Sequence, residues 1–372
     1  MPWNGYARPI APRLTELAKK SVNYPNAYSL SSYTSMSIGG LLSSRYPGEL
    51  DRDGYFFGSY GDKNLFFPEL IQKAGHKTLG GHAHGYFKGT GLNQGFDAWE
   101  IVADLKWNNL TDENITSPQL EGIAEKLLSD PELEQKRFFA WFHFVDPHDG
   151  YMKHEGIDWG QKKARDLYDA EITYTDQYIG KLLDFIASKS WGKHTAIIVT
   201  GDHGESFGEH KMFLHGFEVW QNLVRVPLFF VVPGEAPKTI DAARSAIDIG
   251  PTILDLFGLS EPSFKGKSLL PEIRGKTAEP RDVIVDLPQT SDNDRRRALI
   301  SGTKKIIAYG KSDYMVLYDL EADPDETKQI LSGPAYDEMR AKYKEATKAI
   351  EDVPPTKCRE GCLAGGYQKD GG

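Results

Sequence analysis

The sequence has almost no cysteine, no long apolar run and no excess of positive charge. Only Cys358 and Cys362 occur among 372 residues, so a cysteine-rich zinc site is excluded, and any metal needs oxygen or nitrogen ligands. The spacing of the two cysteines could close a small disulfide or carry no function. No stretch of about 18 apolar residues is present, and the N-terminal residues lack the apolar segment of a signal peptide. These absences predict a soluble chain and leave its localisation open.

The charge balance excludes two classes of partner. The net charge is -9 and the sequence pI is about 5.6, so no basic field attracts nucleic acid or an anionic membrane. Hydrophobic residues make up 40% of the chain and charged residues 26%, which is typical of a globular protein with a large core. We therefore expect neither nucleic acid nor an anionic membrane as a partner, and no membrane segment in the sequence.

The order of apolar patterns up to about residue 190 predicts an α/β fold. Helical stretches alternate there with short apolar strands, which favours a mostly parallel sheet covered by helices on both faces. The expected helices are LTELAKKS at 14–21, FPELIQKAG at 67–75 and a long amphipathic segment at 164–190. The expected strands are KRFFAWFHFV at 136–145 and TAIIVT at 195–200.

The remaining chain predicts one more strand, one more helix and a small antiparallel unit. The strand is VRVPLFFVVPG at 224–234, and the helix is GPTILDLFGL, with Pro251 at its start and Gly258 at its end. From about residue 280 short strands broken by Gly and Asp follow one another. We therefore expect a catalytic domain at 1–275, a small C-terminal antiparallel subdomain at 276–353 and a loose tail at 354–372.

Three polar clusters follow the predicted strands and turns. They are Asp146-Pro147-His148, the pair Asp202 and His203 with His215 close behind, and a Ser/Thr-rich run at 28–40. Ligands gather beyond the carboxyl ends of strands in open α/β sheets. Carboxylate, imidazole and hydroxyl groups that converge on a divalent cation would supply a metal-activated nucleophile.

Each cluster also has an explanation without catalysis. Asp202 could cap the following segment, and Thr34 could be the N-cap of a helix in a Ser-rich turn. His203 and His148 could be buried histidines whose nitrogen atoms are satisfied. The residues by themselves leave both interpretations open.

The order of ten segments resembles the sulfatase family of the alkaline phosphatase superfamily. The matching segments are NAYSLSSYTSMSIGGLLSSRYP, AGHKTLGGHAHGYF, GFDAWE, FVDPHDGY, YDAEITYTDQYIGKLL, VTGDHGESFGEHKMFLHG, VRVPLFFVVPG, DIGPTILDLFGL, GKSLLP and LYDLEADPDET. The resemblance implies an alkaline-phosphatase-like α/β sandwich and a metal-dependent hydrolase of sulfate or phosphate esters. The implied substrate is a small-molecule, glycan or lipid-head-group ester.

The resemblance places the family's nucleophile at Thr34. Counting from Ala27-Tyr28 and back from Arg45-Tyr46-Pro47 gives the same position. Sulfatases carry Cys or Ser there, followed by Pro and Arg, and oxidise it to formylglycine. This chain reads TSMSI instead. A formylglycine hydrate expels sulfate by collapsing to the aldehyde, whereas a Thr ester must be resolved by attack at phosphorus or sulfur.

The other site residues are also implied by the resemblance. Asp202 and His203 would bind a divalent cation (calcium, zinc, manganese or magnesium), with Thr34 between the metal and the scissile centre. His148 and His215 would contact substrate oxygens, and either could be the general acid.

Two further histidines of the resemblance have lesser roles. His84, preceded by His82, matches an element in which the family has Lys before its His, so it is a candidate for substrate binding. His210 would support its loop.

The resemblance also implies a missing element. The family opens with an apolar strand and an Asp-x-x-Arg element that precede the position of Gly5-Tyr6, so we expect an N-terminally truncated sequence that lacks the first strand. Two alternatives remain for its function. A covalent Thr34 intermediate also permits a transferase that passes a phosphoryl-linked group to an acceptor other than water. The missing element and the missing formylglycine motif permit an inactive remnant that acts as a binding module.

Overall fold

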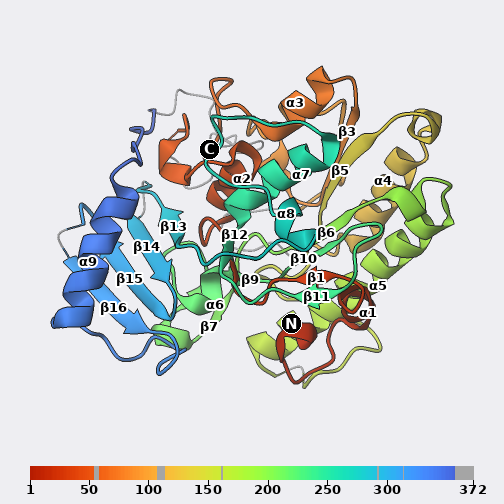
Figure 1. The fold of residues 1–372 in the computed structure, drawn as a ribbon. Coiled ribbons are helices and arrows are strands. Elements are labelled where there is room, and N and C mark those ends of the chain that lie inside the picture. The colour runs from red at the N-terminus through yellow and green to blue at the C-terminus, as the bar shows by residue number, and fades with distance from the viewer. Residues whose placement is uncertain (54–57, 107–113, 161, 291–292, 313, 357–372) are drawn as a thin grey trace, which may run out of the picture.

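The protein folds as helices packed on both faces of a central sheet, with a second sheet at one side (Figure 1). The fold is seen in a computed structural model that describes residues 1–53, 58–106, 114–160, 162–290, 293–312 and 314–356. Cys358 and Cys362 lie outside these residues. None of the helices in the described segments has the length and apolarity that a membrane crossing requires.

Helices of very different lengths cover the sheets. They are α1 (Pro12–Ala18), α2 (Thr34–Ser43), α3 (Phe67–Lys73), α4 (Ser117–Leu128), α5 (Ala164–Ser188), α6 (Gln221–Val224), α7 (Ile249–Phe257), α8 (Leu270–Ile273) and α9 (Pro334–Thr347). The expected helices at 14–21, 67–75, 164–190 and 250–259 correspond to α1, α3, α5 and α7. Helix α7 ends at Gly258, whose φ of 73° is a left-handed conformation that glycine adopts without strain.

The central sheet consists of two separate pieces. The first has the parallel order β4 (Ala98–Ile101), β3 (Lys77–His82), β5 (Phe138–His143). The second has the order β11 (Lys238–Thr239), β1 (Val22–Asn23), β10 (Leu228–Val231), β6 (Ile197–Thr200), and β10 runs antiparallel to both of its neighbours. β5 and β6 are therefore edge strands of different pieces.

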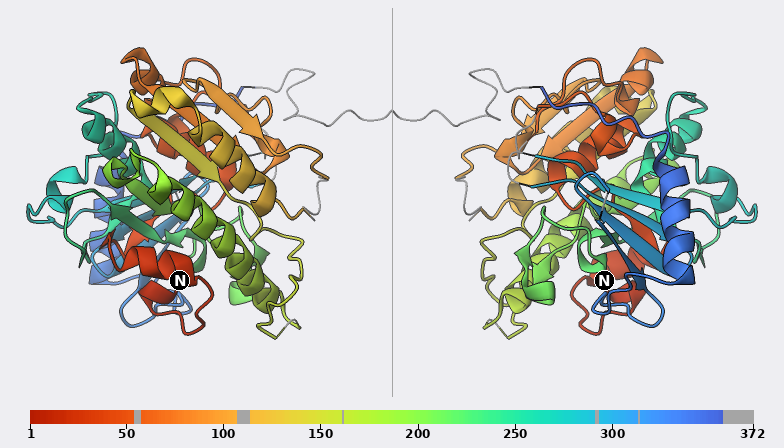
Figure 2. Two further views of the ribbon diagram at one scale, coloured as in Figure 1. Left: turned by 90° about the vertical axis from the view of Figure 1, so that its right-hand side faces the viewer. Right: turned by 90° about the vertical axis from the view of Figure 1, so that its left-hand side faces the viewer.

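Short strands complete the region around the central sheet. One small sheet has the order β12 (Arg244–Ser245), β2 (Ala27–Tyr28), β9 (Arg225–Val226), and a hairpin joins β7 (Ser206–Phe207) to β8 (Phe213–Leu214). The long helix α5 crosses one face with α1 and α4 beside it, while α2, α3 and α7 lie on the other face (Figure 2). The fold is thus the expected α/β class.

The C-terminal sheet is antiparallel throughout. Its order is β13 (Val283–Leu287), β14 (Arg296–Ser301), β15 (Lys304–Tyr309), β16 (Tyr314–Asp319), and α9 packs on β15 and β16. The predicted antiparallel unit is confirmed, whereas the predicted boundary at residue 276 stays a prediction. Short apolar strands separated by segments that contain Gly or Asp explain why this unit could be recognised from its sequence.

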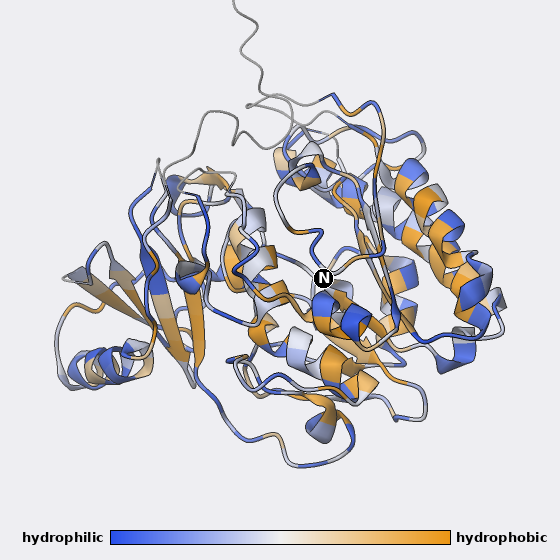
Figure 3. Cartoon of the chain, turned by 90° about the horizontal axis from the view of Figure 1, so that it is seen from above, coloured by the Kyte–Doolittle hydropathy of each residue, from blue (hydrophilic) through white to orange (hydrophobic). Residues whose placement is uncertain are grey.

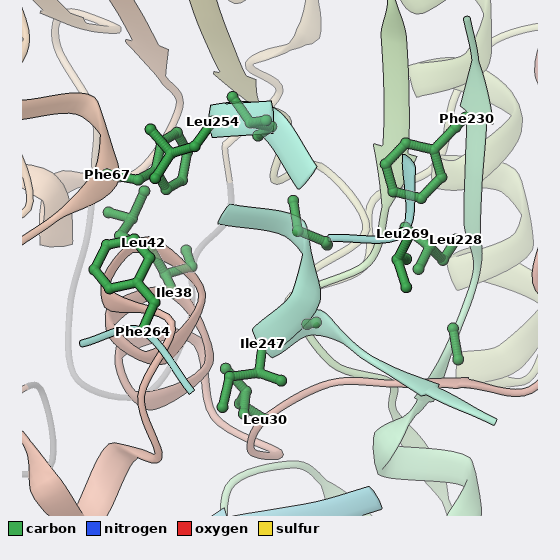
Figure 4. Close-up of a cluster of buried hydrophobic side chains, with 14 of the residues drawn as sticks. Leu30, Ile38, Leu42, Phe67, Leu228, Phe230, Ile247, Leu254, Phe264 and Leu269 are labelled. Atoms are coloured by element: carbon green, nitrogen blue, oxygen red, sulfur yellow. The ribbon is translucent and has the colours of Figure 1, made fainter. Parts of the chain in front are cut away.

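The largest core cluster lies between α2, α3, α7 and the strands β1 and β10. Leu42 of α2, Phe67 of α3 and Leu254 of α7 belong to it and are almost completely buried. Figure 4 shows these side chains, with Phe67 next to Leu254 and with Phe230 of β10 on the far side of the cluster. Figure 3 shows helices on which hydrophobic and hydrophilic residues alternate along the chain, as expected where one side of a helix packs on a sheet.

Carboxylates from other segments cap two of the helices. Asp176 of α5 accepts hydrogen bonds from the N–H groups of Arg13 and Leu14, both at 2.8 Å, in the first turn of α1. Asp146 accepts from the N–H groups of Thr116 and Ser117, at 2.6 and 2.9 Å, where α4 begins. The free N–H groups of a helix start need such partners.

A buried ion pair joins the C-terminal sheet to the loop after α2. Arg297 Nε lies 2.7 Å from Asp286 Oδ1, and both side chains are buried. Asp286 Oδ2 accepts a hydrogen bond from the N–H of Gly48 at 2.7 Å. The pair therefore fixes the sheet against the segment that carries α2.

We expect Asp286→Ala to lower the free energy of unfolding by about 3 kcal/mol, because Arg297 keeps only the exposed carboxylate of Asp352 as a partner and the N–H of Gly48 loses its acceptor. Urea denaturation followed by circular dichroism measures the loss. Lys304→Ala is the matched control, because it breaks a partly exposed pair with Asp319 and should cost less than about 1 kcal/mol. Equal losses in the two variants would contradict the interpretation.

Candidate active site

The polar residues that the sequence singled out meet where β5, β6 and α2 end or begin. Thr34 is the first residue of α2, His148 follows β5, and Asp202 and His203 follow β6. They line one cavity of about 1430 Å³ together with His84 and His215. The structure therefore brings all six candidate residues to one place.

Thr34 and His203 are in direct contact. Thr34 Oγ1 lies 2.9 Å from His203 Nε2, and His203 Nδ1 lies 2.8 Å from the carbonyl oxygen of Gly204. Because a carbonyl oxygen only accepts, Nδ1 carries the proton and Nε2 presents a lone pair to the hydroxyl. Burial lowers the pKa of His203, although Asp202 opposes this shift, so the ring is neutral at pH 7. Thr34 thus donates its hydrogen bond to His203.

The start of α2 favours negative charge near Thr34. Thr34 is the N1 residue of a ten-residue helix, and no side chain caps its N-terminus. Free N–H groups and the helix dipole at this end stabilise an anion or a developing negative charge. Thr34 is therefore an N1 residue and not the N-cap that the sequence left open, since Tyr33 has that position.

Ser37 holds the two halves of the site together. Its hydroxyl donates to the carbonyl oxygen of Asp202 at 2.5 Å and accepts from the N–H of Ser31 at 3.2 Å. The loop before α2 is thereby tied to the loop after β6. This explains why Thr34 and His203, 169 residues apart, keep a fixed distance.

Asp202 is ionised, and one of its carboxylate oxygens has no hydrogen-bond partner among the described residues. Burial by itself raises the pKa of its carboxyl group, but His203, His143 and His215 outweigh this and lower it to about 2. Asp202 Oδ2 lies 3.5 Å from His203 Nε2, and it has no hydrogen-bond partner among the described residues. Asp202 does not cap a helix. Its free oxygen points to a ligand that binds a carboxylate.

His148 and His84 line another side of the cavity. Burial lowers the pKa of His148, and it lowers that of His84 to about 3 with a further contribution from His148. The two rings lie 5.8 Å apart, and Nδ1 of His84 accepts a hydrogen bond from the N–H of Tyr86. His148 Nδ1 is buried and has no partner in the described part of the chain. Both rings are therefore neutral at pH 7.

His215 is oriented by a carboxylate that sequence analysis missed. Its Nδ1 lies 3.2 Å from both oxygens of Glu205, and its ring lies 4.1 Å from His203 and 5.5 Å from His148. Although burial raises the pKa of Glu205, its hydrogen bond and charge interaction with His215 lower it overall. A carboxylate ten residues before a histidine gives no recognisable signal in the sequence.

Three other polar residues named from the sequence have contacts that are explained by packing or by helix capping. His82 is completely buried among the rings of Phe87, Trp99 and Trp141, and burial lowers its pKa strongly. His210 stacks on Trp220 at 4.1 Å, in keeping with support of its loop. Asp146 caps α4, as described above. His143, at the end of β5, also lines the cavity and was missed because it lies inside an apolar run.

The donor set fits one side of a divalent cation site. No group of three or more His, Cys, Asp or Glu side chains within the described segments is arranged to bind a metal. Asp202 Oδ2, His203 Nε2 and Thr34 Oγ1 nevertheless converge, and carboxylate and imidazole ligands suit zinc, manganese, magnesium or calcium to different degrees. The partnerless oxygen of Asp202 supports this interpretation.

Two family models match the sequence. The model described as Sulfatase matches residues 1–259, and the model described as N-sulphoglucosamine sulphohydrolase, C-terminal, matches residues 208–352. The first match covers more than half of the chain, and the second includes the antiparallel sheet.

Individual relatives are similar over part of their length. A choline-sulfatase of Rhizobium meliloti is 30% identical over 189 residues, which are 50% of this chain and 36% of that protein. Arylsulfatase K of Bos taurus is 29% identical over 224 residues, which are 56% of this chain and 40% of that protein. The chain thus matches well under half of the length of these curated relatives.

A solved structure shares the fold over almost its entire length. The phosphonate monoester hydrolase of Agrobacterium radiobacter superimposes with a TM-score of 0.78 at 15% identity, over 94% of this chain and 92% of that chain. At this identity the likeness concerns the fold alone.

We expect His203 to be the neutral Nδ1–H tautomer at pH 7, because the Gly204 carbonyl accepts from Nδ1 and burial disfavours the imidazolium. Long-range proton–nitrogen correlation spectra of the metal-free protein identify the tautomer. Thr34→Val should leave the tautomer unchanged, since Gly204 still accepts. A resonance typical of Nε2–H, or of a doubly protonated ring, would contradict the assigned hydrogen bond.

Proposed function

This chain belongs to the sulfatase family, and from that premise we propose that it hydrolyses sulfate or phosphate esters with Thr34 as the nucleophile. The observation that carries the proposal is the contact between Thr34 Oγ1 and His203 Nε2 at the start of α2. A threonine hydroxyl is a weak nucleophile by itself. Here it lies beside an imidazole lone pair that can accept its proton and at a helix N-terminus that stabilises its alkoxide form.

The proposed reaction has two displacement steps. Thr34 Oγ1 gives its proton to Nε2 of His203 and forms a bond to the sulfur or phosphorus, while the bond to the leaving oxygen breaks. Nε2 of His215, whose Nδ1 faces the Glu205 carboxylate, would donate a proton to the leaving oxygen, and the neutral ring of His148 would hydrogen-bond to the substrate oxygens. Water then gives a proton back to His215 and attacks the same sulfur or phosphorus, which breaks its bond to Thr34, and Oγ1 takes its proton back from His203.

A divalent cation would be held by Asp202, His203 and Thr34. When bound, such an ion lowers the pKa of a hydroxyl and draws charge from the ester oxygens. The charge balance supports its presence, because Asp202 and Glu205 are ionised, His84, His148 and His203 are neutral, and the substrate is itself an anion. Arg165 also lines the cavity, but it is paired with Glu209.

Thr34 favours phosphorus over sulfur as the reacting atom. A threonine ester has no aldehyde to collapse to, so its intermediate must be resolved by attack on the central atom. The phosphonate monoester hydrolase with the same fold is, by its description, an enzyme of phosphorus chemistry. The two curated relatives named above are described as sulfatases, so sulfate esters belong in the same assay.

We expect Thr34→Ala to lower kcat/KM by about a thousandfold or more, because it removes the attacking atom. Thr34→Ser should keep measurable turnover, since it retains the hydroxyl. The assay compares an aryl phosphate monoester, a phosphate diester and an aryl sulfate, each with zinc, manganese, magnesium or calcium. Mass spectrometry of a quenched reaction would detect the substrate-derived group on the peptide that contains Thr34.

Thr347→Ala is the matched control, because it removes a hydroxyl that bonds only within α9. It should retain full activity. Turnover that survives in Thr34→Ala would contradict the role of Thr34. Absence of turnover with every ester and every cation would overturn the proposal and favour a binding module that has kept the fold.

We expect Asp202→Asn to weaken divalent cation binding at least about tenfold, because it replaces a charged ligand by a neutral amide. Isothermal titration calorimetry with manganese or zinc measures the affinity without any substrate. Glu209→Gln removes a nearby carboxylate that pairs with Arg165 and should leave the affinity unchanged. Equal affinities in Asp202→Asn and the unaltered chain would place the cation elsewhere.

A further inference from the structure

Large apolar side chains are exposed on both sides of His215 in the chain. Six large hydrophobic residues are exposed in the described segments, and three of them, Phe213, Leu214 and Phe217, lie at 213–217. Their exposed fractions are 62%, 38% and 40%. Single exposed apolar residues are ordinary, whereas a cluster of them beside a cavity is typical of a ligand-binding surface.

Two members of this cluster line the cavity of the candidate active site. Leu214 and Phe217 line it together with His215, whereas Phe213 does not. They follow β6 in the chain, so they border the cavity beyond the carboxyl ends of the strands, where Thr34 and His203 also lie. We call Leu214 and Phe217 the apolar wall.

The backbone before His215 adopts conformations that most side chains avoid. Leu214 has a φ of 66°, and His210 and Lys211 have φ angles of 52° and 60°. These are left-handed conformations, which are unfavourable for residues other than glycine and persist where the surrounding structure enforces them, often at functional sites. The turn at Leu214 ends β8 directly before His215.

Contacts with the C-terminal sheet hold this segment in place. His210 stacks on Trp220, and the ring of Trp220 lies 5.7 Å from that of Tyr318 in β16. Asn293 Nδ2 donates a hydrogen bond of 2.9 Å to the carbonyl oxygen of Phe217. The apolar wall therefore belongs to a fixed backbone, and binding to it does not require a loop to become ordered.

The charges around the apolar wall disfavour a second anionic group on the substrate. Asp149, Asp202 and Glu205 line the same cavity, and Glu205 contacts His215. Arg165 also lines it but is paired with Glu209. Because these carboxylates repel an anion, the wall suits an uncharged part of the substrate.

We propose that the apolar wall binds the alcohol part of the substrate ester, and that this part is an uncharged apolar group that contains a ring. The proposal rests on the proposed function, in which His215 donates a proton to the leaving oxygen. That oxygen then lies beside His215, so the group attached to it meets Leu214 and Phe217. A flat ring can pack against the ring of Phe217 and cover the side chain of Leu214.

Two other occupants fit these observations less well. A second copy of the chain would need an interface of about 800 Å² on each partner, of which three side chains supply only a part. An anionic membrane would be repelled by the net charge of -9.

Equilibrium binding of 2-naphthol to the full chain tests the wall without any turnover. Calorimetry should detect binding to the unaltered chain and to Thr34→Ala alike, because Thr34 does not belong to the wall. Leu214→Asn and Phe217→Ser should each weaken the affinity about tenfold, since each removes apolar area. Asparagine tolerates the left-handed conformation at 214, so this variant keeps the local backbone. Leu331→Asn, at an exposed leucine that does not line the cavity, is the matched control and should bind normally.

Turnover separates recognition of the alcohol part from the chemistry. Phe217→Ser should lower kcat/KM about tenfold for a 2-naphthyl ester and less than about twofold for a 2,2,2-trifluoroethyl ester, whose alcohol part is too small to cover the wall. Equal losses with both esters would overturn the role of the wall and leave the proposed function standing. No turnover of either ester would contradict the proposed function. In that case equal naphthol affinities in all variants would also overturn the wall.

Two further probes test the chemistry of the occupant. 2-Naphthol-6-sulfonate should bind at least about tenfold more weakly than 2-naphthol at low ionic strength, because the nearby carboxylates repel it. Equal affinity would contradict the requirement for an uncharged group. Vesicles of phosphatidylcholine and phosphatidylserine should not sediment with the chain. Sedimentation that is lost in Phe213→Ser would replace the ring-containing alcohol by a membrane as the occupant.

Discussion

The hydrogen bond from Thr34 to His203 depends on two elements, because α2 begins where β6 ends. Thr34 starts α2, and His203 lies in the loop after β6. The bond therefore exists only if the N-terminus of α2 is held next to the carboxyl end of β6. Ser37 of α2 holds this position, because its hydroxyl donates a hydrogen bond to the carbonyl oxygen of Asp202 in the loop after β6. The core contacts of Leu42 with the α3 and α7 region then hold the far end of the helix. The packing of α2 in the core therefore also fixes the distance between Thr34 and His203.

Charge in this protein is buried mainly where a backbone group or an opposite charge satisfies it. Asp176 and Asp146 cap helices from other segments, and Asp286 binds both Arg297 and the N–H of Gly48. Asp202 has one oxygen without a hydrogen-bond partner among the described residues, as Glu171 also has, but only the oxygen of Asp202 faces the cavity beside Thr34. This position supports the proposed role of Asp202 as a ligand for a group other than protein.

The candidate site could be predicted from the sequence only as far as local pattern reaches. Asp202 and His203 follow an apolar strand, and Thr34 lies in a motif, so each could be named before the structure was known. Glu205 and His143 could not. Glu205 gains its importance from contact with His215, and His143 from its position where β5 ends, and both depend on contacts between distant segments. His82, in contrast, was named from the sequence beside His84, but it is buried among aromatic rings.

The sequence by itself determined the α/β class, the helices α1, α3, α5 and α7, the antiparallel C-terminal sheet and the polar residues at strand ends. These follow from local periodicity, glycine and proline positions and side-chain chemistry, which act within a few residues. Only the tertiary structure decided which histidines share a cavity and which carboxylates cap helices. Such features depend on long-range packing and strand order, because a single residue carries no record of its distant neighbours.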